Sequence, residues 1–322
     1  MENLAKQETV LVTGGTGFIA LYCIQQLLQQ GYTVKTTLRS LSRKDEVIGL
    51  LQEAGISSGE KLSFVEADLT KDNHWDEAVQ GCTYVLHVAS PFPAADPKDA
   101  EELIVPARDG ALRVLKAARE AGVKRVVLTS SFAAIGYSRD PKDHIFTEED
   151  WTDPNLTDNA YVKSKSIAEK AAWDFIAEQG GGLELTVINP VGVFGPALGK
   201  DHSTSIGMIQ AILSGQLKET PGFTFGIVDV RDVAAIHLKA MTATNAAGER
   251  FLATSTGVMS IYDVAELIRK ERPELAENIA ALKPLDASSY IEMSNQKAKD
   301  FFEWEFRSNK EAILASADSL TE

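Results

Sequence analysis

A glycine-rich turn between a strand and a helix constrains the fold of this chain more than any other feature. Residues 9–13 (TVLVT) are apolar and β-branched, which is typical of a buried parallel strand. The turn GGTGFIA follows at residues 14–20, and a helical pattern covers residues 20–30. Glycines let the backbone approach a phosphate closely, and a helix start presents free N–H groups to an anion. This order of elements predicts a binding site for the pyrophosphate of a dinucleotide.

The first half of the chain continues to alternate strands with helices. We expect strands at 9–13, 33–38, 62–67, 84–89, 125–129 and 183–189. We expect helices at 20–30, 44–54, 111–121 and 160–179, several of which end at a glycine. Such alternation predicts an α/β fold with a doubly wound parallel sheet of the Rossmann type.

The pattern becomes less regular after Pro190. A strand at 226–230 and helices at 206–214, 231–240, 260–272 and 295–302 are expected, and the acidic stretch 316–322 is expected to be disordered. No linker rich in Pro, Gly or Ser separates a second domain. We therefore predict a dinucleotide-binding domain (1–189 with 226–254) and a small, mostly helical substrate-binding lobe (190–225 with 255–322).

Charge and composition exclude several classes of function. The 322 residues include 32 Lys and Arg against 46 Asp and Glu, a net charge of -14. A nucleic-acid or anionic-membrane partner is not expected, because either needs a basic face. No secretory signal or membrane-spanning run is visible, and Cys23 and Cys82 have no disulfide or metal-ligand spacing, so we expect a cytoplasmic protein without a metal.

The end of the second predicted strand is basic. Arg39 stands where an unphosphorylated cofactor usually meets Asp or Glu, and Arg43 and Lys44 follow. A guanidinium can bind a 2′-phosphate through two hydrogen bonds, so these residues favour NADP(H); a solvated basic loop is the alternative. Asp68, at the end of the third strand, could accept a hydrogen bond from adenine or could instead cap the next helix.

A Tyr and a Lys that share one helix face suggest an acid–base pair. Tyr161 and Lys165 are four residues apart in the helix at 160–179. A free Tyr has a pKa near 10, and a nearby ammonium lowers it towards the working pH. Ser131 follows the fifth strand, where open α/β sheets bind ligands. An isolated pair would more often be a solvated face, but here the pair accompanies a dinucleotide turn.

These motifs together resemble the extended short-chain dehydrogenase/reductase family. The chain is most similar to the branch of dihydroflavonol reductases, cinnamoyl-CoA reductases and yeast-type aldehyde/ketone reductases. The matching motifs are VTGGTGFIA (12–20), TLRS (37–40), ADLT (67–70), HVASPF (87–92), VVLTSSFAA (126–134), YVKSK (161–165), NPVGVFGP (189–196) and VDVRDVA (228–234).

The resemblance implies a catalytic triad. Tyr161 would donate the proton in carbonyl reduction, Lys165 would lower its pKa and bind the nicotinamide ribose, and Ser131 would hold the substrate oxygen. The Asn that completes the set in related enzymes is not evident in segment 104–110. The residues expected to contact NADP(H) are Gly14, Thr16, Gly17, Phe18, Ile19, Arg39, Arg43, Lys44, Asp68, Leu69, Ala89, Ser90, Thr129, Tyr161, Lys165, Pro190 and Val193.

Two aromatic residues are candidates for the substrate pocket. Phe92 follows the fourth strand and Phe132 follows Ser131. Rings at these positions suit an aromatic or branched aliphatic carbonyl compound, although both could simply pack beneath a loop. His87 lies within an apolar strand and Trp151 lies in an acidic loop, so we expect structural roles for both.

The combined hypothesis is an NADPH-dependent reductase of small aldehydes and ketones, acting as a monomer or homodimer. Two alternatives remain. One is an NAD-dependent sugar-nucleotide epimerase or dehydratase, or a 3β-hydroxysteroid-type dehydrogenase. The other is an NADPH-binding redox sensor, which would have no use for the Tyr–Lys pair.

Overall fold

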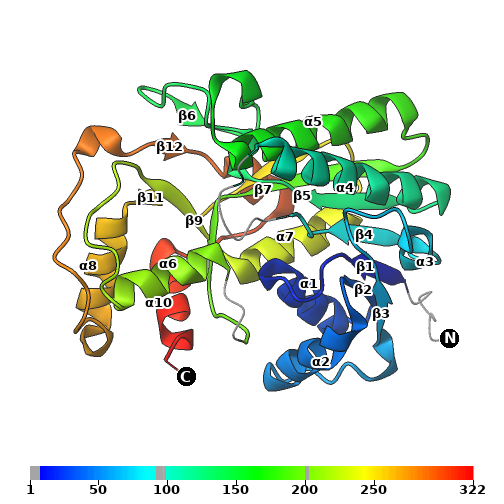
Figure 1. The fold of residues 1–322 in the computed structure, drawn as a ribbon, viewed down its shortest axis with the longest axis horizontal. Helices are drawn as coiled ribbons and strands as arrows, with labels where there is room; N and C mark the ends of the chain where they lie inside the picture. The colour runs from blue at the N-terminus through cyan, green and yellow to red at the C-terminus, as the bar shows by residue number, and fades with distance from the viewer. Residues whose placement is uncertain (1–7, 92–96, 98, 200–202, 322) are drawn as a thin grey trace. The chain divides into compact units, whose positions relative to one another are not determined.

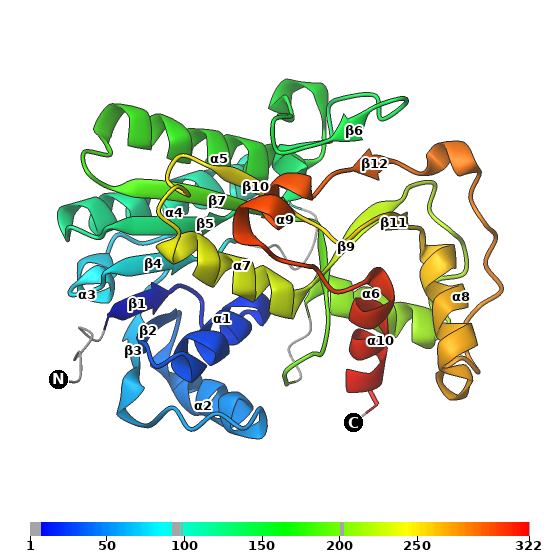
Figure 2. The ribbon, with the colours of Figure 1, turned by 180° about the vertical axis from the view of Figure 1, so that it is seen from behind.

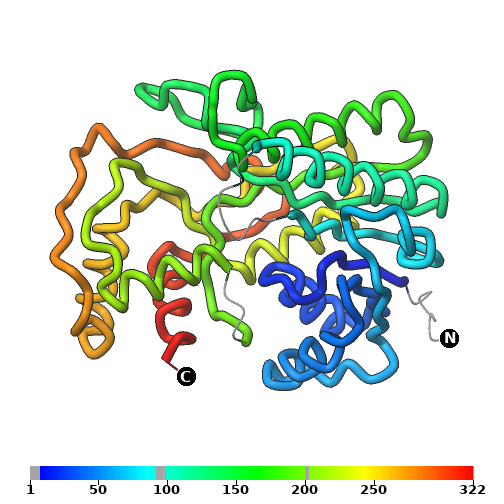
Figure 3. Tube along the Cα trace, viewed as in Figure 1, coloured from blue at the N-terminus to red at the C-terminus, as the bar shows by residue number. Residues whose placement is uncertain are grey.

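The structure is a computed structural model that describes residues 8–91, 97, 99–199 and 203–321. These residues form two compact units. Unit 1 contains the described part of Met1–Ser138 with Trp151–Asn189 and Ala234–Arg250. Unit 2 contains Arg139–Asp150 with the described parts of Pro190–Val233 and Phe251–Glu322. Figure 3 shows the path of the chain, along which segments of the two units alternate.

Unit 1 holds most of a seven-stranded parallel sheet with the order β10-β7-β5-β4-β1-β2-β3. Its strands are β1 (Thr9–Val12), β2 (Thr33–Leu38), β3 (Leu62–Glu66), β4 (Tyr84–His87), β5 (Arg125–Thr129), β7 (Glu184–Pro190) and β10 (Arg250–Ala253). The order reverses between β1 and β4, which are neighbours in the sheet. Open sheets of this kind bind ligands at the carboxyl ends of the strands beside that reversal. The predicted Rossmann-type fold is confirmed.

Helices cover both faces of this sheet. Figure 1 shows α4 (Glu101–Glu120) and α5 (Ala160–Gln179) side by side over one face, with α3 (Trp75–Val79) near them. Figure 2, from the opposite side, shows α1 (Phe18–Gln29) and α7 (Val230–Thr242), the latter with its C-terminal part in unit 1. Helix α2 (Lys44–Glu53) lies against α1. Because both faces are covered, strands such as β5 are buried along their whole length.

The start of β5 carries a fully buried cation, Arg125. Its Nη1 donates to the carbonyl oxygens of Ala240 at 2.7 Å, Met241 at 3.2 Å and Ala243 at 2.6 Å, where α7 ends. Its Nε donates to Glu184 Oε2 at 2.8 Å. The last carbonyl groups of a helix lack partners within the helix and carry partial negative charge. Arg125 therefore satisfies the end of α7 and joins it to the sheet.

Most boundaries of the main sheet and its helices follow the sequence prediction, and three of these elements differ from it. The strands at 33–38 and 125–129 and the helix at 160–179 have the predicted bounds. Helix α4 begins ten residues before the predicted start at 111 and runs through Pro106, a residue that removes one helix hydrogen bond. The sequence prediction missed α3 and also β10, the edge strand of the sheet. Both elements are short, so their apolar pattern is weak.

Unit 2 combines helices with small sheets. Strands β8 (Gly192–Phe194), β9 (Phe225–Asp229) and β11 (Val258–Met259) form one sheet, and β6 (Ile145–Phe146) pairs with β12 (Glu292–Met293). The helices are α6 (Thr204–Leu213), α8 (Ile261–Glu271), α9 (Gln296–Phe302) and α10 (Asn309–Ser319). Side chains from β8, β9, α6, α8 and α10 share one apolar core. Across both units, short 3-10 turns occur at Leu41–Arg43, Gly59–Lys61, Phe132–Ala134, Pro154–Leu156, Pro273–Leu275 and Ala287–Ser289.

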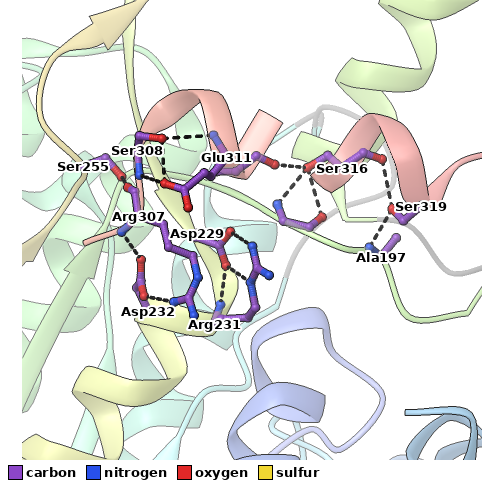
Figure 4. A network of polar contacts seen from close by, with 12 residues as sticks. Ala197, Asp229, Arg231, Asp232, Ser255, Arg307, Ser308, Glu311, Ser316 and Ser319 are labelled. Atoms are coloured by element: carbon purple, nitrogen blue, oxygen red, sulfur yellow. Dashed lines mark hydrogen bonds and ion pairs between the residues drawn. The ribbon is translucent and has the colours of Figure 1, made fainter. Parts of the chain in front are cut away.

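Polar contacts fix the last helix, α10, in unit 2 (Figure 4). The Ser308 hydroxyl accepts from the amide of Glu311 and donates to its carboxylate, which caps the helix start. The Ser316 hydroxyl accepts from the amide of Gly195 at 2.7 Å, and Ser319 accepts from the amide of Ala197 at 2.9 Å. The expectation of disorder from residue 316 is therefore wrong for Ser316–Ser319. The segment is acidic overall, but Ser316 and Ala317 lie on a buried face of α10.

Three further observations concern the described part of the chain. None of its helices is long and apolar enough to cross a membrane. Within the same residues, no group of three or more His, Cys, Asp or Glu side chains could hold a metal ion. Cys23 and Cys82 are both buried and free, as expected of small core residues, and burial raises the pKa of the Cys82 thiol to about 11.

Candidate active site

The glycine turn after β1 is held tightly against the sheet. Gly14 has a φ of +74°, which few other residues adopt readily, and its amide donates to Thr37 Oγ1 at 2.9 Å. A Cβ on Gly15 would lie 2.4 Å from Thr36 Oγ1, closer than any real contact. Gly17, the residue before α1, has no side chain that could accept a hydrogen bond from the amides of the first helical turn. The turn can therefore offer N–H groups to a phosphate.

A hydrogen-bond chain supports this turn from within the sheet. The Thr13 hydroxyl accepts from the amide of Ala89 at 2.9 Å and lies 2.9 Å from His87 Nδ1. The tautomer of His87 determines which of these two atoms donates the hydrogen. Burial and the positive charge of Lys165 lower the pKa of His87 to about 3. His87 is therefore a neutral core residue, as the sequence indicated.

The predicted basic residues lie at the end of β2 and just after it. Arg39 is exposed. Arg43 makes a two-point ion pair with Glu46, with both N–O distances at 2.7 Å, and its Nη1 lies 3.4 Å from Thr16 Oγ1 in the glycine turn. The Lys44 ammonium lies 5.7 Å from the centre of the Phe64 ring. Sequence reasoning missed Glu46 as the partner of Arg43, although its i, i+3 spacing was visible.

Asp68 uses one carboxylate oxygen locally. Asp68 Oδ1 accepts hydrogen bonds from the backbone amide and the hydroxyl of Thr70, each at 2.9 Å. The hydrogen bond from the backbone amide is the main reason that the pKa of Asp68 is lowered. This contact closes a turn and does not cap a helix, because α3 begins only at Trp75. The next residue, Leu69, packs so closely on α4 that a Cβ at Gly110 would lie 2.9 Å from its Cβ.

Ser131, Tyr161 and Lys165 come together within unit 1. The Asn159 side chain accepts from the amide of Val162 at 3.0 Å and starts α5, which places Tyr161 in the first turn. The Tyr161 hydroxyl donates to Ser131 Oγ at 3.4 Å, and the Lys165 ammonium lies 5.7 Å from the centre of the Tyr161 ring. Helix α5 and the segment after β5 thus bring the three predicted side chains together, and their catalytic roles stay a prediction.

Burial dominates the acid–base properties of this group. It raises the pKa of Tyr161, and the hydrogen bond with Ser131 partly offsets that rise. Burial lowers the pKa of Lys165 to about 8, while the negative charge of Glu169 acts in the opposite direction. Burial therefore makes the Lys165 ammonium easier to deprotonate than that of an exposed lysine. That Lys165 lowers the pKa of Tyr161 stays a prediction.

Two aromatic rings lie next to the triad in unit 1. Phe132 is nearly buried, and its ring is 5.6 Å from that of Tyr137 in an edge-on arrangement. Tyr137 is exposed at 55% as a whole residue, yet burial of its hydroxyl raises its pKa, and a negative charge on Tyr161 would add to that rise. Sequence reasoning missed Tyr137, and no spacing pattern marked it. Phe92 lies outside the described residues.

The other predicted contacts occupy different environments. Thr129 ends β5 almost buried, with its hydroxyl 2.7 Å from His237 Nε2, and Ser90 is half-buried after β4. Pro190, at the end of β7, and Val193, in β8, belong to unit 2. Their roles at the cofactor stay predictions.

A parallel sheet with a glycine turn after its first strand and a Ser–Tyr–Lys group at its carboxyl edge defines a short-chain dehydrogenase/reductase of the extended type. Residues 10–253 match the model of the family described as "NAD dependent epimerase/dehydratase family". The chain belongs to that family.

The relatives of this chain include several reductases. The chain is 38% identical to tetraketide alpha-pyrone reductase 2 of Arabidopsis thaliana, over 87% of this chain and 88% of that protein. It is 36% identical to cinnamoyl-CoA reductase CAD2 of Medicago truncatula, over 97% and 95%. The chain is also similar to the crystal structure of yeast methylglyoxal/isovaleraldehyde reductase Gre2 complexed with NADPH, with a TM-score of 0.86. The sequence identity is 32%, and the match covers 97% of this chain and 98% of the Gre2 chain. The expected branch of reductases is confirmed.

Proposed function

We propose that this protein is an NADPH-dependent reductase that converts aldehydes and ketones to alcohols. The observation that carries the proposal is the placement of Tyr161, 3.4 Å from Ser131, in the same unit as the glycine turn. The relatives named above, with reductase activities and an NADPH complex among them, support it. In the overall reaction a carbonyl compound, NADPH and a proton give the alcohol and NADP⁺.

The residues of unit 1 fit this cofactor. The first turn of α1 can bind the pyrophosphate, because Gly17 supplies no side-chain cap to its amides. Gly14 and Gly15 allow the turn to pack directly on Ala89 and Thr36, where a Cβ would clash. Arg39 and Arg43 can bind a 2′-phosphate, which an acidic residue at the same place would repel. When bound, NADPH supplies a hydride from its nicotinamide ring to the carbonyl carbon.

The triad then performs the proton chemistry. Ser131 holds the carbonyl oxygen by a hydrogen bond, and Tyr161 donates its phenolic proton to that oxygen as negative charge develops there. The Lys165 ammonium stabilises the tyrosinate that remains. Because the pKa of Lys165 is about 8, this stabilisation is present below that pH and is lost above it.

NADPH oxidation against a panel of carbonyl compounds tests the proposal. The panel contains branched aliphatic aldehydes, aryl ketones, 2-ketoesters and a dihydroflavonol, with NADH in parallel. Turnover of several members, faster with NADPH than with NADH, is the expected result. No NADPH oxidation with any member of the panel, together with tightly bound NAD⁺ in the purified protein, would instead favour a sugar-nucleotide epimerase or dehydratase.

Arg39→Ala tests whether Arg39 binds the 2′-phosphate of NADPH. Loss of a charge-assisted hydrogen bond costs about 1.5–3 kcal/mol, so we expect the KM for NADPH to rise about 10- to 100-fold. The KM for NADH should stay unchanged. Steady-state kinetics with both cofactors measure this, and Lys71→Ala, which removes an exposed positive charge after β3, is the control. Equal losses with both cofactors would show that Arg39 does not recognise the phosphate.

We also propose that Phe132 and Tyr137 contact the substrate. Gly136 makes this testable, because a Cβ there would lie 2.3–3.0 Å from atoms of the Phe132 ring and must displace it. Gly136→Ala should raise the KM for aryl ketones about tenfold, since a shift of the pocket wall costs about 1–3 kcal/mol. Gly49→Ala in α2, where a Cβ meets nothing within 4 Å, should leave kinetics unchanged. Unaltered aryl-ketone kinetics in Gly136→Ala would place Phe132 outside the pocket.

We propose a cytoplasmic location, which the two buried, unpaired cysteines support because disulfides are rare in that compartment. We also propose a monomer or a symmetric homodimer, the commonest kind of oligomer. Size-exclusion chromatography with light scattering distinguishes these two states.

A further inference from the structure

A buried carboxylate lies one helical turn beyond Lys165. Glu169 is 1% exposed. Four side chains donate hydrogen bonds to it: Ser130 Oγ at 2.5 Å, Arg250 Nε at 2.5 Å, Asn189 Nδ2 at 2.7 Å and Trp173 Nε1 at 3.3 Å. A carboxylate offers about four acceptor positions. Its hydrogen-bonding capacity is therefore used almost completely.

These donors join several elements of unit 1 around the triad. Ser130 adjoins Ser131 after β5, and Asn189 lies on the neighbouring strand β7. The Asn189 amide also donates to the backbone oxygen of Ser131 at 3.2 Å. Glu169 itself is on α5, the helix of Tyr161 and Lys165. The carboxylate thus ties the strand end that carries the serine to the helix that carries the tyrosine.

The charge of Glu169 has a buried counter-ion. Arg250 is nearly buried, and its guanidinium lies 3.6 Å from the centre of the Trp151 ring. Burying an ion pair costs desolvation free energy, and the Coulomb attraction between the two charges seldom exceeds that cost by much. Apolar residues of similar volume often stabilise a fold equally well. A buried pair beside catalytic groups therefore suggests a role in the reaction.

We propose that Glu169 is a positioning residue: its carboxylate fixes Ser131, through Ser130 and Asn189, at the distance from Tyr161 that proton donation needs, and it places a negative charge one helical turn from Lys165. The inference rests on the proposed reductase function and deepens it. Small misplacements of catalytic groups are costly, because the reacting atoms must be aligned within fractions of an ångström.

The groups around Lys165 determine the sign of the electrostatic effect. Glu169 faces it from the same helix, Tyr161 lies one turn before it, and His87 on β4 is neutral. The negative charge of Glu169 raises the pKa of Lys165 against the effect of burial. Removal of that charge therefore lowers the pKa further, and Lys165 loses its proton at a lower pH.

Glu169→Gln tests the proposal, with Glu178→Gln as the matched control on the exposed side of the same helix. We expect Glu169→Gln to reduce kcat about 10- to 100-fold, in the range seen for misplaced groups, with the Kd for NADPH unchanged. We expect the alkaline limb of the kcat profile to follow the loss of the Lys165 proton, and it should move to lower pH in Glu169→Gln. Glu178→Gln should match the wild type in every measurement.

Two further variants separate positioning from folding. Glu169→Gln/Arg250→Met removes the unpaired buried charge that the single variant leaves. We expect it to recover the thermal midpoint but not kcat. Ser130→Ala keeps the ion pair and should reduce kcat while leaving the alkaline limb in place. Recovery of kcat together with stability in the double variant would show that Glu169 only stabilises the fold.

A measurement without turnover keeps the inference separate from the proposed function. NMR titration of protein labelled with ¹³C at lysine Cε, with Lys165→Met for assignment, gives the pKa of Lys165 directly. A lower pKa in Glu169→Gln, but not in Glu178→Gln, supports the electrostatic part even if no carbonyl compound is reduced. If wild-type kcat and an unmoved Lys165 pKa are found in Glu169→Gln, the inference is wrong, whereas an inactive wild type would contradict the proposed reaction.

Discussion

Tyr161→Phe is expected to reduce kcat for carbonyl reduction about 10²- to 10⁴-fold, the usual contribution of a general acid. The substitution removes the proton donor and leaves the ring, the helix and Lys165 in place. NADPH binding, followed by quenching of tryptophan fluorescence, should be unchanged within about twofold, because the glycine turn and Arg39 are untouched. Stopped-flow measurement of hydride transfer checks the result directly.

Tyr137→Phe is the comparison variant, since it removes a phenolic hydroxyl that we assign to substrate contact and not to proton donation. It should retain kcat within a few-fold, and any effect should appear in the KM for the carbonyl substrate. Near wild-type turnover in Tyr161→Phe would refute the proton-donor role. Equal losses in both variants would point to general damage of the pocket.

Arg125→Met is expected to destabilise the protein by about 3 kcal/mol, since removing one member of a buried ionic network leaves its partners unpaired. The carbonyl oxygens at the end of α7 lose their donor inside unit 1, and Glu184 loses its counter-ion. Equilibrium unfolding in urea, monitored by circular dichroism, gives the free energy of unfolding.

The control for this prediction is Arg119→Met. Arg119 pairs with the exposed Glu120 near the end of α4, where an ion pair contributes at most about 1 kcal/mol. Arg125→Lys should fall between the two, because lysine keeps the charge but lacks the planar fork that reaches several oxygens at once. A loss below about 1 kcal/mol in Arg125→Met would mean that water replaces the guanidinium at the helix end.

Much of the site could be predicted from sequence because its parts are local. Tyr161 and Lys165 share one helix, whose start is fixed by the Asn159 cap, so their spacing alone places them together. Ser131 and the glycine turn follow strands with strong β-branched patterns. In a parallel sheet such strand ends meet at one edge.

The remaining parts depend on contacts between distant residues. Arg250 meets Glu169 across 81 positions of sequence, and no periodic pattern links them. No sequence pattern marks Ser130, yet its hydroxyl donates a hydrogen bond to the buried carboxylate of Glu169. Strand β10, which carries Arg250, is four residues long and pairs only at the sheet edge, so its pattern was too short to identify.

The fixing of α10 in unit 2 has a consequence for how the chain folds during synthesis. Every segment of unit 1 has been translated once Arg250 is made, whereas the core of unit 2 requires β8 and β9 together with a helix that ends at Ser319. Domains form as their segments leave the ribosome. The reductase scaffold around Tyr161 can therefore fold first, while strands β8 and β9 await a partner translated about eighty residues later. During that interval their apolar faces are exposed, and this is when we expect chaperones to bind the nascent chain.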